Sequence, residues 1–241
     1  MSQLRQPLGR SRLTSSHRNA RKRRTYPKDK YEAAEAAVDA FKQAHTDYCI
    51  FGSLAFKLLG VACKPNDADI IVLDTTKSLE DLKEYLVGAC NRFYLMPSRN
   101  RKAEYRVLWY ATRKGARRVK VDILQPGEMS IPEFRANIIS YETPPGKSGR
   151  AFSIPVAPLE LVLLLKLGGW LEHYTSGVPH RKAKEPEDVK QIRALLIKYK
   201  RQFDFDYLPG DFVDQAEENV REYTSIYPSS KGSWRRVGLY H

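Results

Sequence analysis

Two aspartates, Asp67 and Asp69, are separated by one residue in a segment whose other positions are mostly apolar. Because side chains alternate across a strand, a strand here would place both carboxylates on one face and direct Ala68, Ile70 and Val72 into a core. Two carboxylates that close repel each other, which costs stability unless a cation lies between them. Hard oxygen ligands at an open edge suit Mg²⁺, which keeps waters and binds substrate phosphates. The pair therefore predicts a magnesium site.

A third carboxylate, Asp122, lies in the segment 117–124, where Val and Ile occupy the alternate positions. The same alternation puts Asp122 and Lys120 together on the polar face of a second strand. If the two strands are neighbours, three carboxylates converge, which is enough for two metal ions about 4 Å apart. The alternative is that all three acids are surface residues and that Asp122 pairs with Lys120.

A short apolar segment ends at Phe51-Gly52-Ser53 and is followed by a helical pattern over 54–59. Glycine allows the backbone to approach a ligand closely, and the free N–H groups at a helix start suit a triphosphate. The Ser53 hydroxyl can add one hydrogen bond. We therefore expect Gly52 and Ser53 to bind a nucleotide.

Together these residues resemble the signature of polymerase-β-like nucleotidyltransferases, which is an apolar residue, Gly-Ser, a gap of roughly ten, and then Asp-apolar-acid-apolar. Here Phe51-Gly52-Ser53 is followed, after thirteen residues, by Asp67-Ala68-Asp69-Ile70. Within that superfamily the chain looks most similar to small single-chain enzymes related to abortive-infection toxins. The segments that carry this finer likeness are Ala157-Pro-Leu-Glu-Leu and Arg181…Asp188…Ile192.

The resemblance implies transfer of a nucleoside monophosphate from an NTP such as ATP to an acceptor hydroxyl, with Mg²⁺ or Mn²⁺ as cofactor. Asp67 and Asp69 would bind both metal ions. Asp122, matching the family's third acid, would bind the catalytic ion and orient the acceptor. The resemblance also implies a helical second domain.

Other side chains could assist. Lys166, within an apolar helix, could bind a triphosphate, which we prefer to a role in which its stem covers the core. Arg181 could contact phosphate or an RNA backbone, or be part of a solvated loop. His173 lacks metal-ligand spacing and is expected to be structural. Trp109 could stack on a base, but core packing is the preferred interpretation.

The net charge of +13 is unevenly distributed. Residues 1–30 contain seven Arg and three Lys against one Asp, which gives +9 and leaves +4 for the rest. This segment has few large apolar residues and is predicted to be a disordered basic tail. It could be an RNA-gripping arm, a nuclear-import patch or a solvated tail without a fixed partner. The tail favours RNA, with its 3′ end, as the acceptor.

The remaining patterns predict an α+β fold, with a mixed or antiparallel sheet flanked by helices, followed by a C-terminal helical bundle. We expect the nucleotidyltransferase domain over 31–150, the helical domain over 151–227 and a C-terminal tail over 228–241. The expected helices are 31–44, 54–59, 78–89, one from Pro158 that Gly168-Gly169-Trp170 ends, 185–200 and 211–223. The expected strands are 47–51, 67–73, 92–97, 104–111 and 117–124, with a hairpin turn at 112–115.

No apolar run is long enough to span a bilayer, and the N-terminus has no signal-peptide pattern. The three cysteines form no Cys-x-x-Cys pair, so we expect free thiols in a reducing compartment, cytoplasmic or nuclear. The oligomeric state stays open. Two rivals to the enzyme hypothesis are a catalytically inactive nucleotidyltransferase-fold protein that binds nucleic acid and an unrelated interaction domain.

Overall fold

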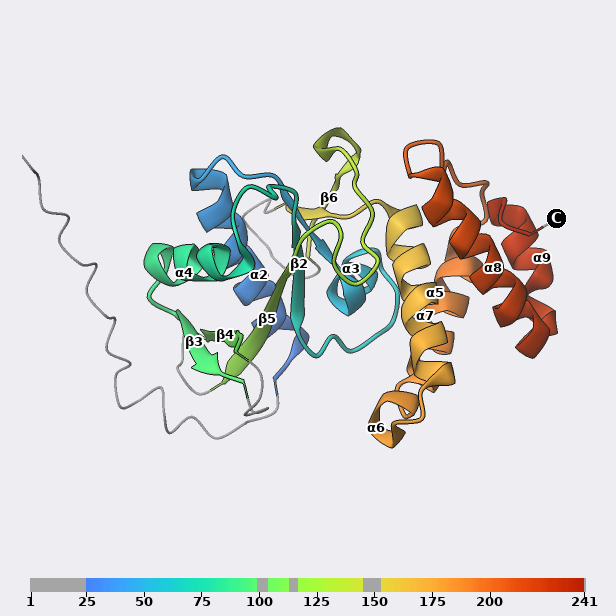
Figure 1. Ribbon diagram of the computed structural model, residues 1–241, viewed down its shortest axis with the longest axis horizontal. Coiled ribbons are helices and arrows are strands. Elements are labelled where there is room, and N and C mark those ends of the chain that lie inside the picture. The colour runs from blue at the N-terminus through green and yellow to red at the C-terminus, as the bar shows by residue number, and fades with distance from the viewer. Residues whose placement is uncertain (1–24, 99–103, 113–116, 145–152, 241) are drawn as a thin grey trace, which may run out of the picture.

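The computed structural model describes residues 25–98, 104–112, 117–144 and 153–240. Within these ranges a seven-stranded sheet runs in the order β3-β4-β5-β2-β1-β7-β6 (Figure 1). The strands are β1 (Tyr48–Phe51), β2 (Ala68–Val72), β3 (Phe93–Pro97), β4 (Arg106–Ala111), β5 (Arg118–Leu124), β6 (Ser140–Glu142) and β7 (Ile154–Val156).

The sheet is mixed, as the sequence predicted. β2 pairs with β5 in parallel and with β1 in antiparallel fashion, while β3, β4 and β5 form an antiparallel meander. The turn expected at 112–115 lies, beyond Thr112, outside the described residues.

β6 and β7 were not expected, and β7 extends the sheet past residue 150, where we had placed the domain boundary. β7 pairs with β1 in parallel and with β6 in antiparallel fashion. Each is only three residues long, too short to show a period in the sequence.

The first helix, α2 (Pro27–Gln43), begins earlier than predicted. Residues 27–30, which we had assigned to the basic tail, form its first turn. Proline is suited to the first helical turn, and the Asp29 side chain accepts a hydrogen bond of 2.6 Å from the Tyr26 backbone N–H. The predicted disorder of residues 1–24 lies outside the described part of the chain.

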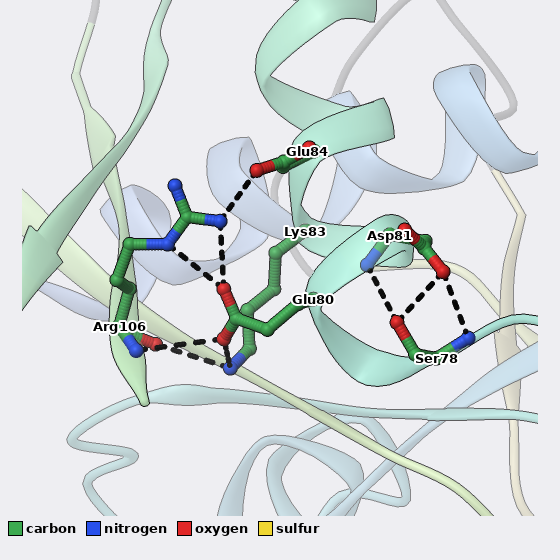
Figure 2. A network of polar contacts seen from close by, with 6 residues as sticks. All are labelled: Ser78, Glu80, Asp81, Lys83, Glu84 and Arg106. Atoms are coloured by element: carbon green, nitrogen blue, oxygen red, sulfur yellow. Dashed lines mark hydrogen bonds and ion pairs between the residues drawn. The ribbon is translucent and has the colours of Figure 1, made fainter. Parts of the chain in front are cut away.

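Helix α4 (Leu79–Ala89) packs with α2 near β5 and is fixed to β4 by a polar network. Figure 2 shows Ser78 and Asp81 exchanging hydrogen bonds at its start, a capping box. The same figure shows Glu80 between Lys83 and Arg106, whose Nε lies 2.9 Å from Glu80 Oε2. This network ties the helix to the first residue of the strand that carries Trp109.

The helical part gathers at one end of the molecule, beyond α3 (Gly52–Leu58), and α4 lies at the other end (Figure 1). The elements of the helical part are α5 (Leu159–Thr175), α6 (Pro179–Lys182), α7 (Glu185–Lys198), α8 (Gly210–Ile226), the 3₁₀ turn η2 (Pro228–Ser230) and α9 (Lys231–Val237). Another 3₁₀ turn, η1 (Ala136–Ile138), lies between β5 and β6. Helix α5 contacts both α3 and α7, so the helical part is joined to the site end of the sheet.

Two expectations for the helical part were wrong. Gly168 and Gly169 do not end α5, because Trp170 is fully buried and its ring packs edge-on against Tyr223 at 4.7 Å between centroids. That burial outweighs the helix-propensity cost of glycine, about 1 kcal/mol each.

The C-terminal tail predicted over 228–241 is instead folded as η2 and α9. Trp234 and Val237 are fully buried. Gly238, at a φ of +92°, ends α9 in the left-handed conformation that glycine adopts most easily. The spacing of these apolar residues is helical, but the segment is too short for a firm prediction.

Cys49, Cys63 and Cys90 are free thiols, as expected. None of the helices in the described ranges is long and apolar enough to cross a membrane.

Candidate active site

The strand register brings two of the three predicted carboxylates side by side. Asp69 of β2 is paired with Asp122 of β5, and Phe51 of β1 is paired with Asp69 on its other side. The neighbourhood of the two strands, which the sequence could only assume, is therefore confirmed. Asp67 directly precedes β2, one residue before Ala68.

The carboxylates interact electrostatically. Burial raises the pKa of Asp69 to about 7, and the negative charges of Asp122 and Asp67 add to that shift. Burial also raises the pKa of Asp67, against the opposing effect of the Lys120 ammonium. The acids thus behave as one coupled group.

Lys120 is the cation of this group. Its Nζ lies 2.6 Å from Asp122 Oδ2. Burial by itself would lower the pKa of Lys120, but the hydrogen bond and the charge of Asp122 raise it above its usual value. The pairing of Asp122 with Lys120, which we kept as an alternative, is therefore present beside the other two acids. The charge of one ammonium acts on all three acids.

The donor chemistry of this group fits a divalent cation. All three acids offer hard oxygens, and their repulsion is relieved by positive charge. Among the described side chains, however, no three Asp, Glu, His or Cys residues are gathered as a ready ligand set, and Asp122 contacts Lys120 instead. Asp67, Asp69 and Asp122 would hold the ion, and binding requires that Lys120 share or release Asp122.

Gly52 lies directly against the carboxylates. Its φ is +63°, and a Cβ added to it would lie 2.4 Å from Asp69 Oδ2. Only glycine meets both conditions without strain. The Cys63 thiol donates a hydrogen bond to the Ser53 carbonyl, with 3.3 Å between sulfur and oxygen, and so attaches the following loop to this turn.

Lys166 is held by a partner that the sequence did not predict. Its Nζ lies 3.0 Å from Asp188 Oδ1, and His173 Nδ1 lies 2.5 Å from Asp188 Oδ2. Asp188 is buried, and it joins α5 to α7 across 22 positions of sequence, a separation at which no local pattern could have indicated the pair. The positive charge of Lys166 lowers the pKa of Asp69, so Lys166 acts on the carboxylate group from the α5 side.

Two further residues considered in the sequence, Arg181 and His173, lie in the helical part. Arg181 is exposed on α6 and stays a prediction as a phosphate ligand. His173 has the structural role that we expected, through its contact with Asp188.

A pocket of about 800 Å³ opens on the Asp67 side of the group. The preferred core position of Trp109 was wrong, because Trp109 is half-buried and lines this pocket, whereas its neighbour Tyr110 fills the core. Sequence reasoning missed most of the lining, since it comes from the start of α2, the loop before β2, and strands β4 and β5. The lining residues are Thr25, Tyr26, Pro27, Lys30, Lys64, Pro65, Asn66, Asp67, Trp109, Arg118 and Lys120.

Comparison with known proteins rests on structure, since no protein-family model matches the chain and a search of curated sequences returned no match. An antigenic nucleotidyltransferase-like protein from Paracoccidioides brasiliensis superposes with a TM-score of 0.64 at 13% identity, over 88% of this chain and 94% of that one. This chain has a nucleotidyltransferase fold. The α+β architecture expected from the sequence is thereby confirmed, and the shared feature is the fold.

Two structures of the antibiotic-resistance factor ANT(2'')-Ia are also similar, with lower TM-scores. A solution structure gives a TM-score of 0.44 at 12% identity, over 83% of this chain and 97% of that one. A crystal structure in complex with adenylyl-2"-tobramycin gives 0.42 at 13% identity, over 81% and 97%.

Proposed function

We propose that this chain transfers a nucleoside monophosphate from a metal-bound NTP to an acceptor hydroxyl. The observation that carries the proposal is the row formed by Gly52, which directly follows β1, Asp69 of β2 and Asp122 of β5. In this row a residue that must be glycine touches one carboxylate, and that carboxylate is in register with another. Ordinary surface acids would have no reason to exclude a side chain at Gly52.

The proposed reaction is a displacement at the α-phosphorus. The acceptor oxygen forms a bond to phosphorus as the bond to the bridging oxygen of the β-phosphate breaks, and pyrophosphate leaves with that electron pair. The acceptor proton passes to Asp122, on the β5 side of the row. Catalysis of this kind depends on positioning and charge stabilisation, and it needs no covalent enzyme intermediate.

Each residue has a part in that positioning. Gly52 and Ser53 would contact the triphosphate on the β1 side, where the absence of a side chain leaves Asp69 accessible. Lys166 would contribute positive charge from α5 while Asp188 holds its ammonium in place. Mg²⁺, or Mn²⁺ in its place, would be held by Asp67, Asp69 and Asp122 and would neutralise charge on the phosphates.

A thermal denaturation series tests this proposal. Each of the four NTPs is added with Mg²⁺, and the midpoint is expected to rise with the preferred NTP, because a ligand that binds only the folded state stabilises it. Asp69→Asn and Asp122→Asn are expected to lose most of that rise, whereas Asp39→Asn, an exposed acid on α2, should keep it.

Pyrophosphate release completes the test, with total RNA, protein and small metabolites offered separately as acceptors. The proposal requires release that depends on one acceptor pool and on both Asp69 and Asp122. Stabilisation by an NTP without pyrophosphate release from any pool would instead favour the catalytically inactive relative that binds nucleic acid.

A further inference from the structure

The pocket lined by Trp109, Arg118 and Lys120 lies on the opposite side of the carboxylates from Gly52. Gly52 directly follows β1, the neighbouring strands β2 and β5 carry Asp69 and Asp122, and β4 carries Trp109 beyond them. Trp109 is paired in register with Lys120. A donor at Gly52 and a ligand in this pocket would therefore meet at the carboxylates from opposite sides.

The pocket is built around positive charge. Lys30, Lys64, Arg118 and Lys120 line it, and Asp67 is its only acidic lining residue among those that the structure describes. A polycationic acceptor would meet repulsion from four cations here. An anionic ligand fits the charge of the lining.

Two of these cations form no ion pair with a described carboxylate. Lys30 is only 2% exposed, and its Nζ donates to the Thr25 hydroxyl at 2.5 Å. Burial lowers the pKa of Lys30, and the charges of Asp29 and Asp67 only partly offset this effect. Arg118 Nε is buried and has no hydrogen-bond partner within the described ranges. Buried donors of this kind are costly unless a partner satisfies them. An anionic oxygen in the pocket would supply that partner.

Aromatic rings accompany the cations. The Arg118 guanidinium lies over the Trp109 ring at 4.7 Å, which fixes the indole at the pocket wall, and Tyr26 is half exposed nearby on the lining. Base stacking on such rings is tolerant of base identity and contributes about 1–3 kcal/mol per base. An acidic peptide would use the cations but has no nucleobase to stack on the open faces of these rings.

We propose that this pocket binds the acceptor as a nucleotide unit, with its base against Trp109 and its phosphate on Lys30 and Arg118. The proposal rests on the proposed nucleotidyl transfer and identifies its acceptor class. The pocket volume is within the range of small-molecule sites, so one or two nucleotide units fit. The acceptor hydroxyl would be presented to the carboxylate group at Asp67 and Lys120, where Asp122, the partner of Lys120, takes its proton.

The source of the nucleotide is either the 3′ end of a single-stranded RNA or a free mononucleotide. The sequence Arg21-Lys22-Arg23-Arg24 is joined directly to Thr25, which lines the pocket. Further positive charge in this part of the chain favours a ligand with several phosphates, and therefore RNA.

The test measures binding to the full-length protein without NTP or metal. The probe is a short oligoadenylate with a fluorescent 5′ label and a free 3′ hydroxyl, followed by fluorescence anisotropy. Trp109→Ala is expected to weaken binding about tenfold, and Trp109→Phe, which keeps a ring, should restore most of it. Arg118→Gln should weaken binding by a similar factor and reduce the salt dependence by about 0.7 log units of affinity per log unit of salt.

Arg236→Gln on α9 is the matched control, since it removes one exposed cation far along the helical part and should leave the affinity unchanged. Intrinsic fluorescence gives a second readout. Trp170 and Trp234 are fully buried, so quenching by oligoadenylate should come from Trp109.

Competition experiments identify the source of the bound nucleotide. If only unlabelled oligoadenylate displaces the probe, the pocket binds an RNA end. If AMP displaces the probe equally well, the pocket binds a free nucleotide. Equal affinity in the Trp109, Arg118 and Arg236 variants would overturn the proposal. So would displacement by a glutamate-rich peptide that is as effective as oligoadenylate.

The two proposals fail in different ways. Oligoadenylate binding that depends on Trp109, without transfer to any acceptor, would contradict only the proposed function. Full transfer to RNA by Trp109→Ala and Arg118→Gln would contradict only the assignment of this pocket.

Discussion

Replacing Gly52 by alanine would add one carbon at the point where β1 passes Asp69. That carbon would lie 2.4 Å from Asp69 Oδ2, about 1 Å closer than the ordinary contact limit of 3.4 Å. The residue would also have to keep a φ of +63°, which side chains adopt with strain. Gly127 has a comparable φ of +90°, but a Cβ there would meet nothing within 4 Å.

Comparison of the alanine variants at Gly52 and Gly127 therefore distinguishes the cost of backbone strain from the cost of the contact with the Asp69 carboxylate. Gly127→Ala should lower the free energy of unfolding by about 1–2 kcal/mol, through strain alone. Gly52→Ala should lower it by that amount and about 1–3 kcal/mol more, because a buried contact must open. In a protein of this size each kcal/mol corresponds to a fall of about 2–4 °C in Tm.

Urea denaturation and a thermal melt measure the stability difference, and pyrophosphate release measures its effect on transfer. A shift of about 1 Å in a reacting group can lower the reaction rate about a hundredfold. The rate of pyrophosphate release should therefore fall by about two orders of magnitude in Gly52→Ala and stay near the wild-type rate in Gly127→Ala. Equal stability and equal activity of the two variants would refute the claim that Gly52 is shaped around Asp69.

Three further predictions concern charge and capping. The pKa of Asp69 is raised from 3.8 to about 7 in the folded state, so the folded state binds more protons between these values. The free energy of unfolding should therefore fall as pH rises from about 4 to about 7, by at most about 4 kcal/mol. Urea titrations should show a flatter pH profile in Asp69→Asn, and an unchanged slope would contradict the raised pKa of Asp69. Asp188→Asn leaves the Lys166 ammonium without its counter-charge and should destabilise the protein by about 3 kcal/mol in the same assay, while Asp39→Asn should change stability by less than about 0.5 kcal/mol. Ser78→Ala removes the α4 cap and should lower the free energy of unfolding by about 1 kcal/mol, whereas Ser78→Asp should lower it much less. Equal losses of stability in both variants would show that the cap contributes little.

The strands that carry the acids could be predicted from sequence because apolar residues flank each acid. β5 alternates throughout, and β2 alternates over Ala68–Ile70, so the facing of Asp69 and Asp122 follows from local geometry. Their neighbourhood did not follow from alternation, since strand order depends on contacts between distant segments. It came from the family resemblance, and the register confirmed it.

The pocket could not be predicted, because its walls come from four separate segments. Lys30 was assigned to a basic tail, and only the start of α2 at Pro27 makes it a buried lining residue. Trp109 was expected in the core. The alternation of side chains along a strand shows which residues share a face of the sheet, but it does not show which face the helices cover. In β4 the covered face carries Leu108 and Tyr110, and Trp109 is left at the pocket.

The most direct test of the account follows a label from the α-phosphate of an NTP into an acceptor. The wild-type protein with Mg²⁺ should transfer label to RNA 3′ ends, and Asp69→Asn and Asp122→Asn should each reduce that transfer by several orders of magnitude while Asp39→Asn retains it. Undiminished transfer by both carboxylate variants would contradict the account, because the row formed by Asp69 and Asp122 would then not be the catalytic centre.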